Sequence, residues 1–143
     1  METRDKDKTV ATLVKDSERL RFLPKYLDRW MMKGENIIFS VMGKLSCDYN
    51  GGHWNFYELS NGGFFMAPSS DSQFNICVPG NHSESAVSPD AAGVIATLFA
   101  LNQLMYIIPE SSDDLEKIVN FYYLLRDFAV EHQEGSKIMS AID

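Results

Sequence analysis

The sequence predicts a single α+β domain in which a three-stranded antiparallel meander packs against a buried central helix, with further helices around it. Three observations indicate this fold. Two runs rich in aromatic residues, 53–60 and 64–68, flank an Asn-Gly-Gly turn. A run of alternating apolar residues, 73–79, follows them, and residues 91–101 are apolar on nearly every side of a helix. At 143 residues the chain is long enough to bury such a core.

The N-terminal segment, residues 1–16, is expected to be a partly flexible arm, and residues 17–143 a single domain. The arm begins with the charged sequence METRDKDK, which lacks the apolar segment that a signal peptide requires. Within the arm, residues 9–14 (TVATLV) fit either a short edge strand or an extended arm. The residues alone leave both alternatives open.

Helices are expected between the arm and the first strand. A short helix over residues 17–23 should end at Pro24, because proline is not tolerated in a helix interior. A second short helix, over residues 24–32, should end at Gly34. From Glu35 onward, apolar residues recur at helical spacing and predict a longer helix with one apolar stripe. The stripe consists of Ile37, Ile38, Val41, Met42 and Leu45.

The two aromatic runs predict a β-hairpin. Aromatic side chains suit a pleated, half-buried surface, and Asn-Gly at residues 61–62 supplies the positive φ angles of a tight turn. A second Asn-Gly-Gly, at residues 50–52, ends the preceding helix and leads into the first strand. Residues 73–79 should form the third strand, because the loop before them is short enough for antiparallel pairing with the second strand.

Residues 80–87 (GNHSESAV) are expected to be a polar loop, and the central helix follows over about residues 89–106. Ser88 should cap this helix, with proline at the first helical position and Asp90 near the positive end of the helix dipole. A helix that is apolar all round must be buried all round. Three small residues would let another backbone approach it closely: Ala92, Gly93 and Ala96.

A connection at residues 109–114, with Ser111 or Ser112 as the cap, precedes a last long helix that extends to about Glu131. Its inward-facing residues should be Leu115, Ile118, Val119, Tyr122, Leu125 and Phe128. Gly135 should break this helix, and residues 137–142 can add one final turn.

The charge balance limits the classes of partner. Lys and Arg total 13 and Asp and Glu total 20, which gives a net charge of −7. This charge disfavours stable DNA binding and adsorption to anionic membranes. It also falls short of an acidic DNA mimic, which needs dense rows of carboxylates. With two cysteines and no apolar run of about 18 residues, a cytoplasmic protein with free thiols is expected.

No motif in the sequence indicates catalysis. A nucleophile needs a base beside it, and two local sets offer one: Cys47, Asp48 and His53, and Cys77, His82 and Glu84. No recognisable nucleophile motif surrounds either set. The spacings of the histidines and cysteines match no short zinc-ligand pattern, and the Asn-Gly-Gly turns lack the helix and lysine of a phosphate loop. We therefore expect no catalytic residue, cofactor or metal.

Tyr49 and Trp54 are the candidate partner-binding residues. They lie where the glycine-rich loop meets the first strand, at the rim of the predicted sheet. Trp and Tyr are favoured anchors in protein interfaces, so a partly exposed member of this pair would suit contact with a partner. A rim aromatic can equally complete the core.

Four stretches of the chain resemble the ArdB/KlcA family of antirestriction proteins. They are RLRFLPKYL at 19–27, DYNGGHWNFYELSNGGFFMAP at 48–68, SPDAAGVIATLFALNQL at 88–104 and LLRDFAVEH at 124–132. Together they span nearly all of the chain after the first few residues, in the family's order. The sequence departs from the family at the N-terminus and in the loops at 69–72 and 81–87.

The resemblance implies an α+β protein carried by plasmids, phages or genomic islands. Such a protein acts in the bacterial cytoplasm, where it inhibits type I restriction–modification systems and so protects incoming DNA. The resemblance also implies action without catalysis or a cofactor, by direct or indirect contact with a protein of that system. The alternatives are a cysteine-dependent hydrolase that uses Cys47 or Cys77, and an acidic DNA-mimic inhibitor.

Overall fold

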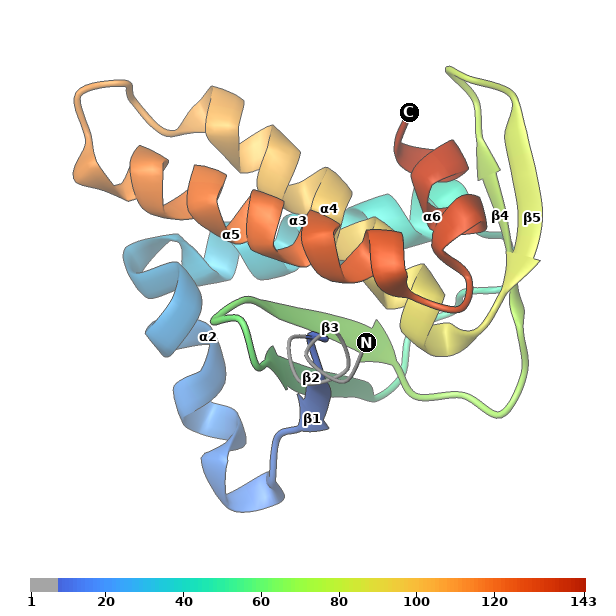
Figure 1. The fold of residues 1–143 in the computed structure, drawn as a ribbon, viewed down its shortest axis with the longest axis horizontal. Coiled ribbons are helices and arrows are strands. Elements are labelled where there is room, and N and C mark those ends of the chain that lie inside the picture. The colour runs from blue at the N-terminus through green and yellow to red at the C-terminus, as the bar shows by residue number, and fades with distance from the viewer. Residues whose placement is uncertain (1–7) are drawn as a thin grey trace.

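The computed structural model describes residues 8–143 and contains two antiparallel sheets beside a layer of helices (Figure 1). The larger sheet has the strand order β1 (Ala11–Leu13), β2 (Trp54–Leu59) and β3 (Phe64–Pro68). The smaller sheet pairs β4 (Phe74–Val78) with β5 (Ser83–Val87). The predicted α+β class and the three-stranded antiparallel sheet are therefore confirmed.

The identity of the third strand was predicted wrongly. The larger sheet is completed by β1, which pairs antiparallel with β2, so residues 9–14 contain an edge strand. The predicted third strand forms β4 instead and pairs with β5, in a stretch that was expected to be a loop. A tight turn explains this local pairing: His82 has a positive φ of 58°, and the side-chain oxygen of Asn81 accepts a hydrogen bond from the backbone N–H of Ser83.

The predicted hairpin is present as β2 and β3. Gly62 has a φ of 97°, which favours glycine, and Asn61 Oδ1 accepts a hydrogen bond of 2.9 Å from the N–H of Gly63. The Asn61 side-chain amide also donates to the carbonyl of Leu124, at 2.9 Å, and so ties the turn to the last long helix. The turn thus sets both the register of the hairpin and its position against the helical layer.

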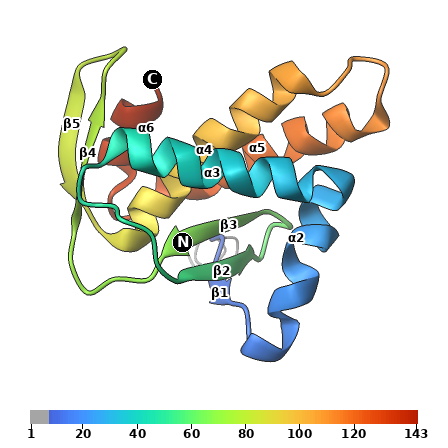
Figure 2. The same cartoon turned by 180° about the vertical axis from the view of Figure 1, so that it is seen from behind.

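The central helix is α4 (Pro89–Ile107), which lies between α3 (Met31–Leu45) and α5 (Asp113–Glu131) (Figure 1 and Figure 2). It also packs against β3 and α6 (Gly135–Ile142). Because neighbours surround it, every residue from 91 to 98 is buried, as predicted. The helix is long and apolar enough to cross a membrane, but most of that stretch is buried in the protein, as in the core helix of a folded domain.

α2 (Arg19–Leu27) was predicted to break at Pro24, and this prediction was wrong. Pro24 lies inside the helix, between the short 3₁₀ turns η1 (Asp16–Glu18) and η2 (Asp28–Trp30) that flank it. Proline cannot donate a hydrogen bond to the carbonyl of Leu20, but Leu20 is 93% exposed, so water can hydrate that carbonyl. The helix ends instead at Asp28, whose φ is 53°.

Gly34 was predicted to end a helix and lies inside α3 instead. A Cβ atom at this position would stand 2.7 Å from Leu27 Cδ1, so the glycine allows the end of α2 to pack tightly on α3. The predicted apolar stripe of α3 does face the core: Ile38, Val41, Met42 and Leu45 are buried, and Ile37 is half-buried.

The C-terminal helices agree with the sequence pattern. Ser112 is the N-cap of α5, and its Oγ accepts a hydrogen bond from the N–H of Asp114 at 3.2 Å. Among the predicted inward-facing residues of α5, Ile118 and Leu125 are buried and the others are half-buried. α6 starts at Gly135 and is longer than the single predicted turn.

Candidate functional site

Tyr49 and Trp54 contact each other where the loop of residues 46–53 enters β2. The indole Nε1 of Trp54 donates a hydrogen bond of 3.0 Å to Tyr49 Oη, and the two rings meet edge to face with centroids 5.7 Å apart. Phe39 of α3 also packs against Trp54, at 5.2 Å between ring centroids. Trp54 is only 4% exposed and belongs to the core, whereas Tyr49 is half-buried. Tyr49 is therefore the member of the pair that reaches the surface.

Asp48 fixes the same loop to the smaller sheet. Its Oδ2 accepts hydrogen bonds from the backbone N–H and the side-chain amide of Asn75, at 2.8 and 3.2 Å. The loop then returns to β2 through Gly51 and Gly52, whose φ angles of 95° and 108° suit glycine. Tyr49 thus lies between Asp48, which is bonded to Asn75, and β2, where Trp54 bonds to its hydroxyl.

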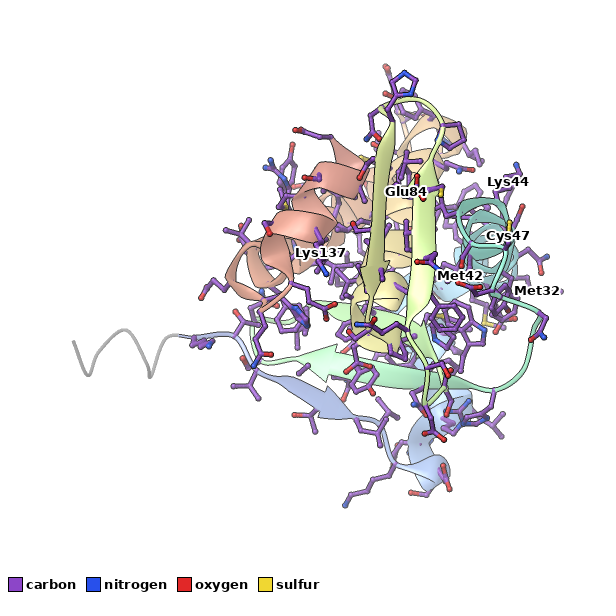
Figure 3. All side chains as sticks on the ribbon, turned by 90° about the vertical axis from the view of Figure 1, so that its right-hand side faces the viewer. Met32, Met42, Lys44, Cys47, Glu84 and Lys137 are labelled. Carbon is purple, nitrogen blue, oxygen red and sulfur yellow. The ribbon has the colours of Figure 1, made fainter. Side chains whose placement is uncertain are left out.

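One cysteine, Cys47, lies in this loop and the other, Cys77, lies in β4, and neither is arranged as a nucleophile. In Figure 3 the smaller sheet stands between α6, which carries Lys137, and the end of α3, which leads to Cys47. Cys47 and Cys77 are both exposed free thiols. Desolvation and the neighbouring Glu84 carboxylate raise the pKa of the Cys77 thiol, which disfavours the thiolate. Among residues 8–143, no hydrogen bond joins either thiol to a histidine.

Ser88 caps α4 and also connects it to α6. Its Oγ accepts a hydrogen bond from the N–H of Ala91, at 3.1 Å, and donates one to Glu134 Oε2. The backbone N–H of Ser88 donates to Glu134 Oε1 at 2.8 Å. The Glu134 carboxylate therefore occupies the positive end of the α4 dipole. Sequence reasoning did not find Glu134, which lies 46 residues from Ser88 and forms no local pattern with it.

A pocket beside this cap brings together Ser88, Asp90, His132 and Glu134 in a volume of about 410 Å³. These residue types suggest a catalytic triad, but the hydrogen bonds do not form one. Ser88 donates to the Glu134 carboxylate, while His132 Nδ1 accepts a hydrogen bond of 2.9 Å from the backbone N–H of Glu134. The arrangement caps a helix, and the His132 imidazole bonds to the backbone and not, as a triad would require, to the serine hydroxyl.

Asp90 lies in the first turn of α4, close to Tyr57 of β2. Burial, followed by the effect of the Asp90 carboxylate, raises the pKa of Tyr57. Both observations fit a structural role at the junction of helix and sheet. Within the part of the chain that the structure describes, no group of three His, Cys, Asp or Glu side chains is placed to hold a metal ion.

Comparison with known proteins gives a consistent result along the whole chain. The family described as "Antirestriction protein" matches residues 47–143, which include Tyr49, both hairpins and α4 to α6. Two Escherichia coli proteins named antirestriction protein KlcA are similar over nearly their full length. One is 47% identical over 94% of this chain and 93% of the relative, and the other is 42% identical over all of both chains.

A solved structure has the same fold. It superposes with a TM-score of 0.87 and 43% sequence identity, over 94% of this chain and 95% of the solved chain. The work that describes it concerns the KlcA and ArdB proteins. It reports a novel fold and antirestriction activity against type I DNA restriction systems in vivo but not in vitro.

Proposed function

The chain belongs to the antirestriction protein family, and from this membership we propose that it protects incoming plasmid or phage DNA against type I restriction–modification systems in the bacterial cytoplasm. The observation that carries this proposal is similarity over the full chain to KlcA proteins, together with the shared fold. The fold and the function expected from the four sequence stretches thus agree with the family.

The protein acts in this proposal without catalysis. Two features of the described residues support that view: the imidazole of His132 bonds to the backbone and not to the Ser88 hydroxyl, and both cysteines lack a hydrogen-bonded base. A nucleophile without such a base is weakly reactive. The protein would then work by binding, and its effect would depend on a surface and not on a reacting group.

A double variant tests the absence of catalysis. Cys47→Ala/Cys77→Ala removes both thiols at exposed positions, so the fold should be preserved. We expect the variant to relieve restriction of a plasmid in cells as well as the wild type does. Loss of protection by a variant whose melting temperature is unchanged would instead support a cysteine-dependent hydrolase.

The partner in this proposal is a protein of a type I restriction–modification system, contacted directly or through another cellular component. The KlcA and ArdB proteins act in vivo but not in vitro, which favours a requirement for a component of the living cell. Tyr49 and its anchored loop are our candidate contact, with Trp54 positioning the Tyr49 ring from the core. DNA mimicry is disfavoured, because 13 basic residues offset the 20 acids, whereas a mimic needs dense rows of carboxylates.

A further inference from the structure

The loop that follows α3 is held against β4 on both sides of Cys47. Before the cysteine, α3 itself packs against β4. After it, Asp48 Oδ2 accepts hydrogen bonds from the backbone N–H and the side-chain amide of Asn75, a residue of β4, at 2.8 and 3.2 Å. The N–H of Tyr49 donates to the carbonyl of Ser46 at 3.4 Å and closes a turn that contains Cys47. Figure 3 shows the end of α3, with Cys47 labelled, next to the smaller sheet.

Cys77 lies on the exposed face of β4, two residues beyond Asn75. Side chains alternate along a strand, so Asn75 and Cys77 point to the same side, and both are exposed while their neighbours in β4 are buried. Two strand residues span roughly 7 Å, which separates Cys77 from the residue that binds Asp48. Since Cys47 is the chain neighbour of Asp48, the two cysteines flank the same pair of hydrogen bonds.

The electrostatics of Cys77 also indicate that the two thiols are close. Desolvation, the Glu84 carboxylate and the Cys47 thiol together raise the pKa of Cys77. The effect of one charge on another weakens with distance and is screened in water, so a thiol acts only on near neighbours. The chain has two cysteines, so each is the other's single partner within one molecule.

We propose that Cys47 and Cys77 form a reversible disulfide within one chain when the protein meets a disulfide oxidant such as oxidised glutathione. The bridge joins the loop after α3 to β4. Bridged cysteines have Cα atoms about 4.4–6.8 Å apart, and the bond from Asp48 to Asn75 holds the loop within reach of that separation. The movement that closes the bridge falls on an exposed turn and leaves the core in place. This modification does not depend on the proposed antirestriction function.

The reaction transfers two electrons from the thiols to the oxidant. Because the raised pKa of Cys77 disfavours its thiolate, Cys47 makes the first attack. Its thiolate bonds to one sulfur of the oxidant, whose S–S bond breaks and releases one glutathione thiolate. Cys77 then loses its proton and attacks the Cys47 sulfur, which forms the bridge and releases the second glutathione thiolate. The two thiol protons pass through water to the released thiolates.

The ratio of oxidised to reduced glutathione sets the balance between thiols and bridge. In a reducing solution both cysteines remain thiols. As the share of oxidised glutathione rises, the bridge replaces them, because the second attack occurs within one molecule and the anchored loop gives each thiol a high effective concentration at the other. The bridge then fixes the loop that carries Tyr49 to the smaller sheet.

Incubation of the full chain in glutathione buffers, from fully reduced to fully oxidised, tests the proposal. The reaction is stopped with acid and the remaining thiols are alkylated. Mass spectrometry without reductant should then show a monomer that is lighter than the reduced protein by two hydrogen atoms. Proteolysis should yield a peptide pair that joins Cys47 to Cys77, and dithiothreitol should separate the pair.

Cys47→Ser and Cys77→Ser are matched controls, because each leaves one exposed thiol without its partner. Each should accumulate a mixed disulfide with glutathione in the buffers that bridge the wild type. Asp48→Ala removes both hydrogen bonds to Asn75 and should need a several-fold higher ratio of oxidised to reduced glutathione for half-bridging. Asp71→Ala removes an exposed carboxylate from the loop before β4 and should bridge as the wild type does. All four substitutions are at exposed positions, so the fold should be kept.

Four results would overturn the proposal. Both wild-type cysteines could carry glutathione instead of the bridge, or the oxidised protein could form a dimer linked between chains. The thiols could remain reduced in the fully oxidised buffer. Asp48→Ala could also bridge at the wild-type ratio, which would show that its bonds to β4 do not bring the thiols together.

Discussion

A single hydrogen bond joins Trp54, in the core, to Tyr49, at the surface. Truncation of the two side chains should therefore have different effects. Trp54→Ala should lower the free energy of unfolding by about 3–5 kcal/mol, as expected for a large buried aromatic residue. Tyr49→Ala should cost less, because Tyr49 is only partly buried. Denaturant unfolding measures both values.

Restriction relief by the same two variants tests the contact surface. If Tyr49 touches a partner, Tyr49→Ala should lose more activity than its small loss of stability explains. If both variants lose activity only in proportion to lost stability, Tyr49 is a packing residue and this surface does not exist.

Gly93 is the point at which α4 approaches β3 closely. A Cβ atom there would lie 2.4 Å from both the carbonyl oxygen of Met66 and the Cβ of Ala67, so neither neighbour could avoid it without a backbone shift. Gly93→Leu should destabilise the domain by overpacking, at a cost of about 1–3 kcal/mol or more. Thermal unfolding followed by circular dichroism measures this cost.

Gly43 provides the matched control, because it also lies inside a helix but a Cβ atom added there would meet nothing within 4 Å. Gly43→Ala should be neutral or stabilising by up to about 1 kcal/mol, since alanine has the higher helix propensity. A Gly93→Leu protein as stable as the wild type would show that α4 and β3 pack more loosely than these distances imply.

At the scale of elements, the sequence predicted those helices and strands whose formation depends on residues close together in the chain. The hairpin of β2 and β3 follows from one Asn-Gly turn, and α4 follows from its cap and its continuous apolar run. The pairing of β1 with β2 joins Thr12 to Glu58, which no local pattern indicates. Pro24 was wrongly predicted to end a helix, because the exposure of Leu20 to water allows proline inside α2. Gly34 was wrongly predicted to end a helix, because it serves instead to let Leu27 pack closely on α3.

For the candidate contact surface around Tyr49, too, the sequence did not predict contacts between residues that are far apart in the chain. The position of Tyr49 in the loop that leads into β2 could be predicted from the two glycines that follow it. The anchoring of its loop could not, because Asp48 bonds to Asn75, 27 residues away. Burial of Trp54 likewise depends on Phe39, which belongs to a separate helix.

Glu58 links β2 to α2 and makes this contact dependent on pH. Its Oε2 accepts hydrogen bonds of 2.7 Å from Lys25 Nζ and from Tyr26 Oη, and these bonds lower the pKa of Glu58 in the folded protein. The unfolded chain then binds a proton more readily than the folded one. The stabilisation is therefore complete above the ordinary glutamate pKa of about 4.3 and is lost as the pH falls through the lower folded-state value.

Denaturation midpoints measured from neutral pH down to about pH 3 test this linkage. The wild type should lose stability as the solution becomes acidic. Glu58→Gln should be less stable at neutral pH and should show a shallower fall, because glutamine does not titrate. Equal slopes for the two proteins would mean that Glu58 contributes nothing to the pH dependence.

At the scale of the whole molecule, the net charge of −7 predicts weak DNA binding. Inhibition of restriction should therefore not depend on binding to DNA. Duplex DNA would be repelled, because 20 acidic residues outnumber 13 basic ones. A gel-shift titration at physiological salt should show only weak, nonspecific binding. Binding tighter than about 10⁻⁶ M would contradict this account, because dedicated nonspecific binders typically reach only about 10⁻⁴–10⁻⁶ M.

Relief of restriction in living cells is the most direct test of the central claim. An unmodified plasmid with type I recognition sites is introduced into two otherwise identical hosts, one with and one without the type I system, each with and without this protein. We expect the protein to raise transformation efficiency in the restricting host and to leave it unchanged in the other. An absence of relief against every type I system tested, or an equal increase in both hosts, would contradict the claim that this chain is an antirestriction protein.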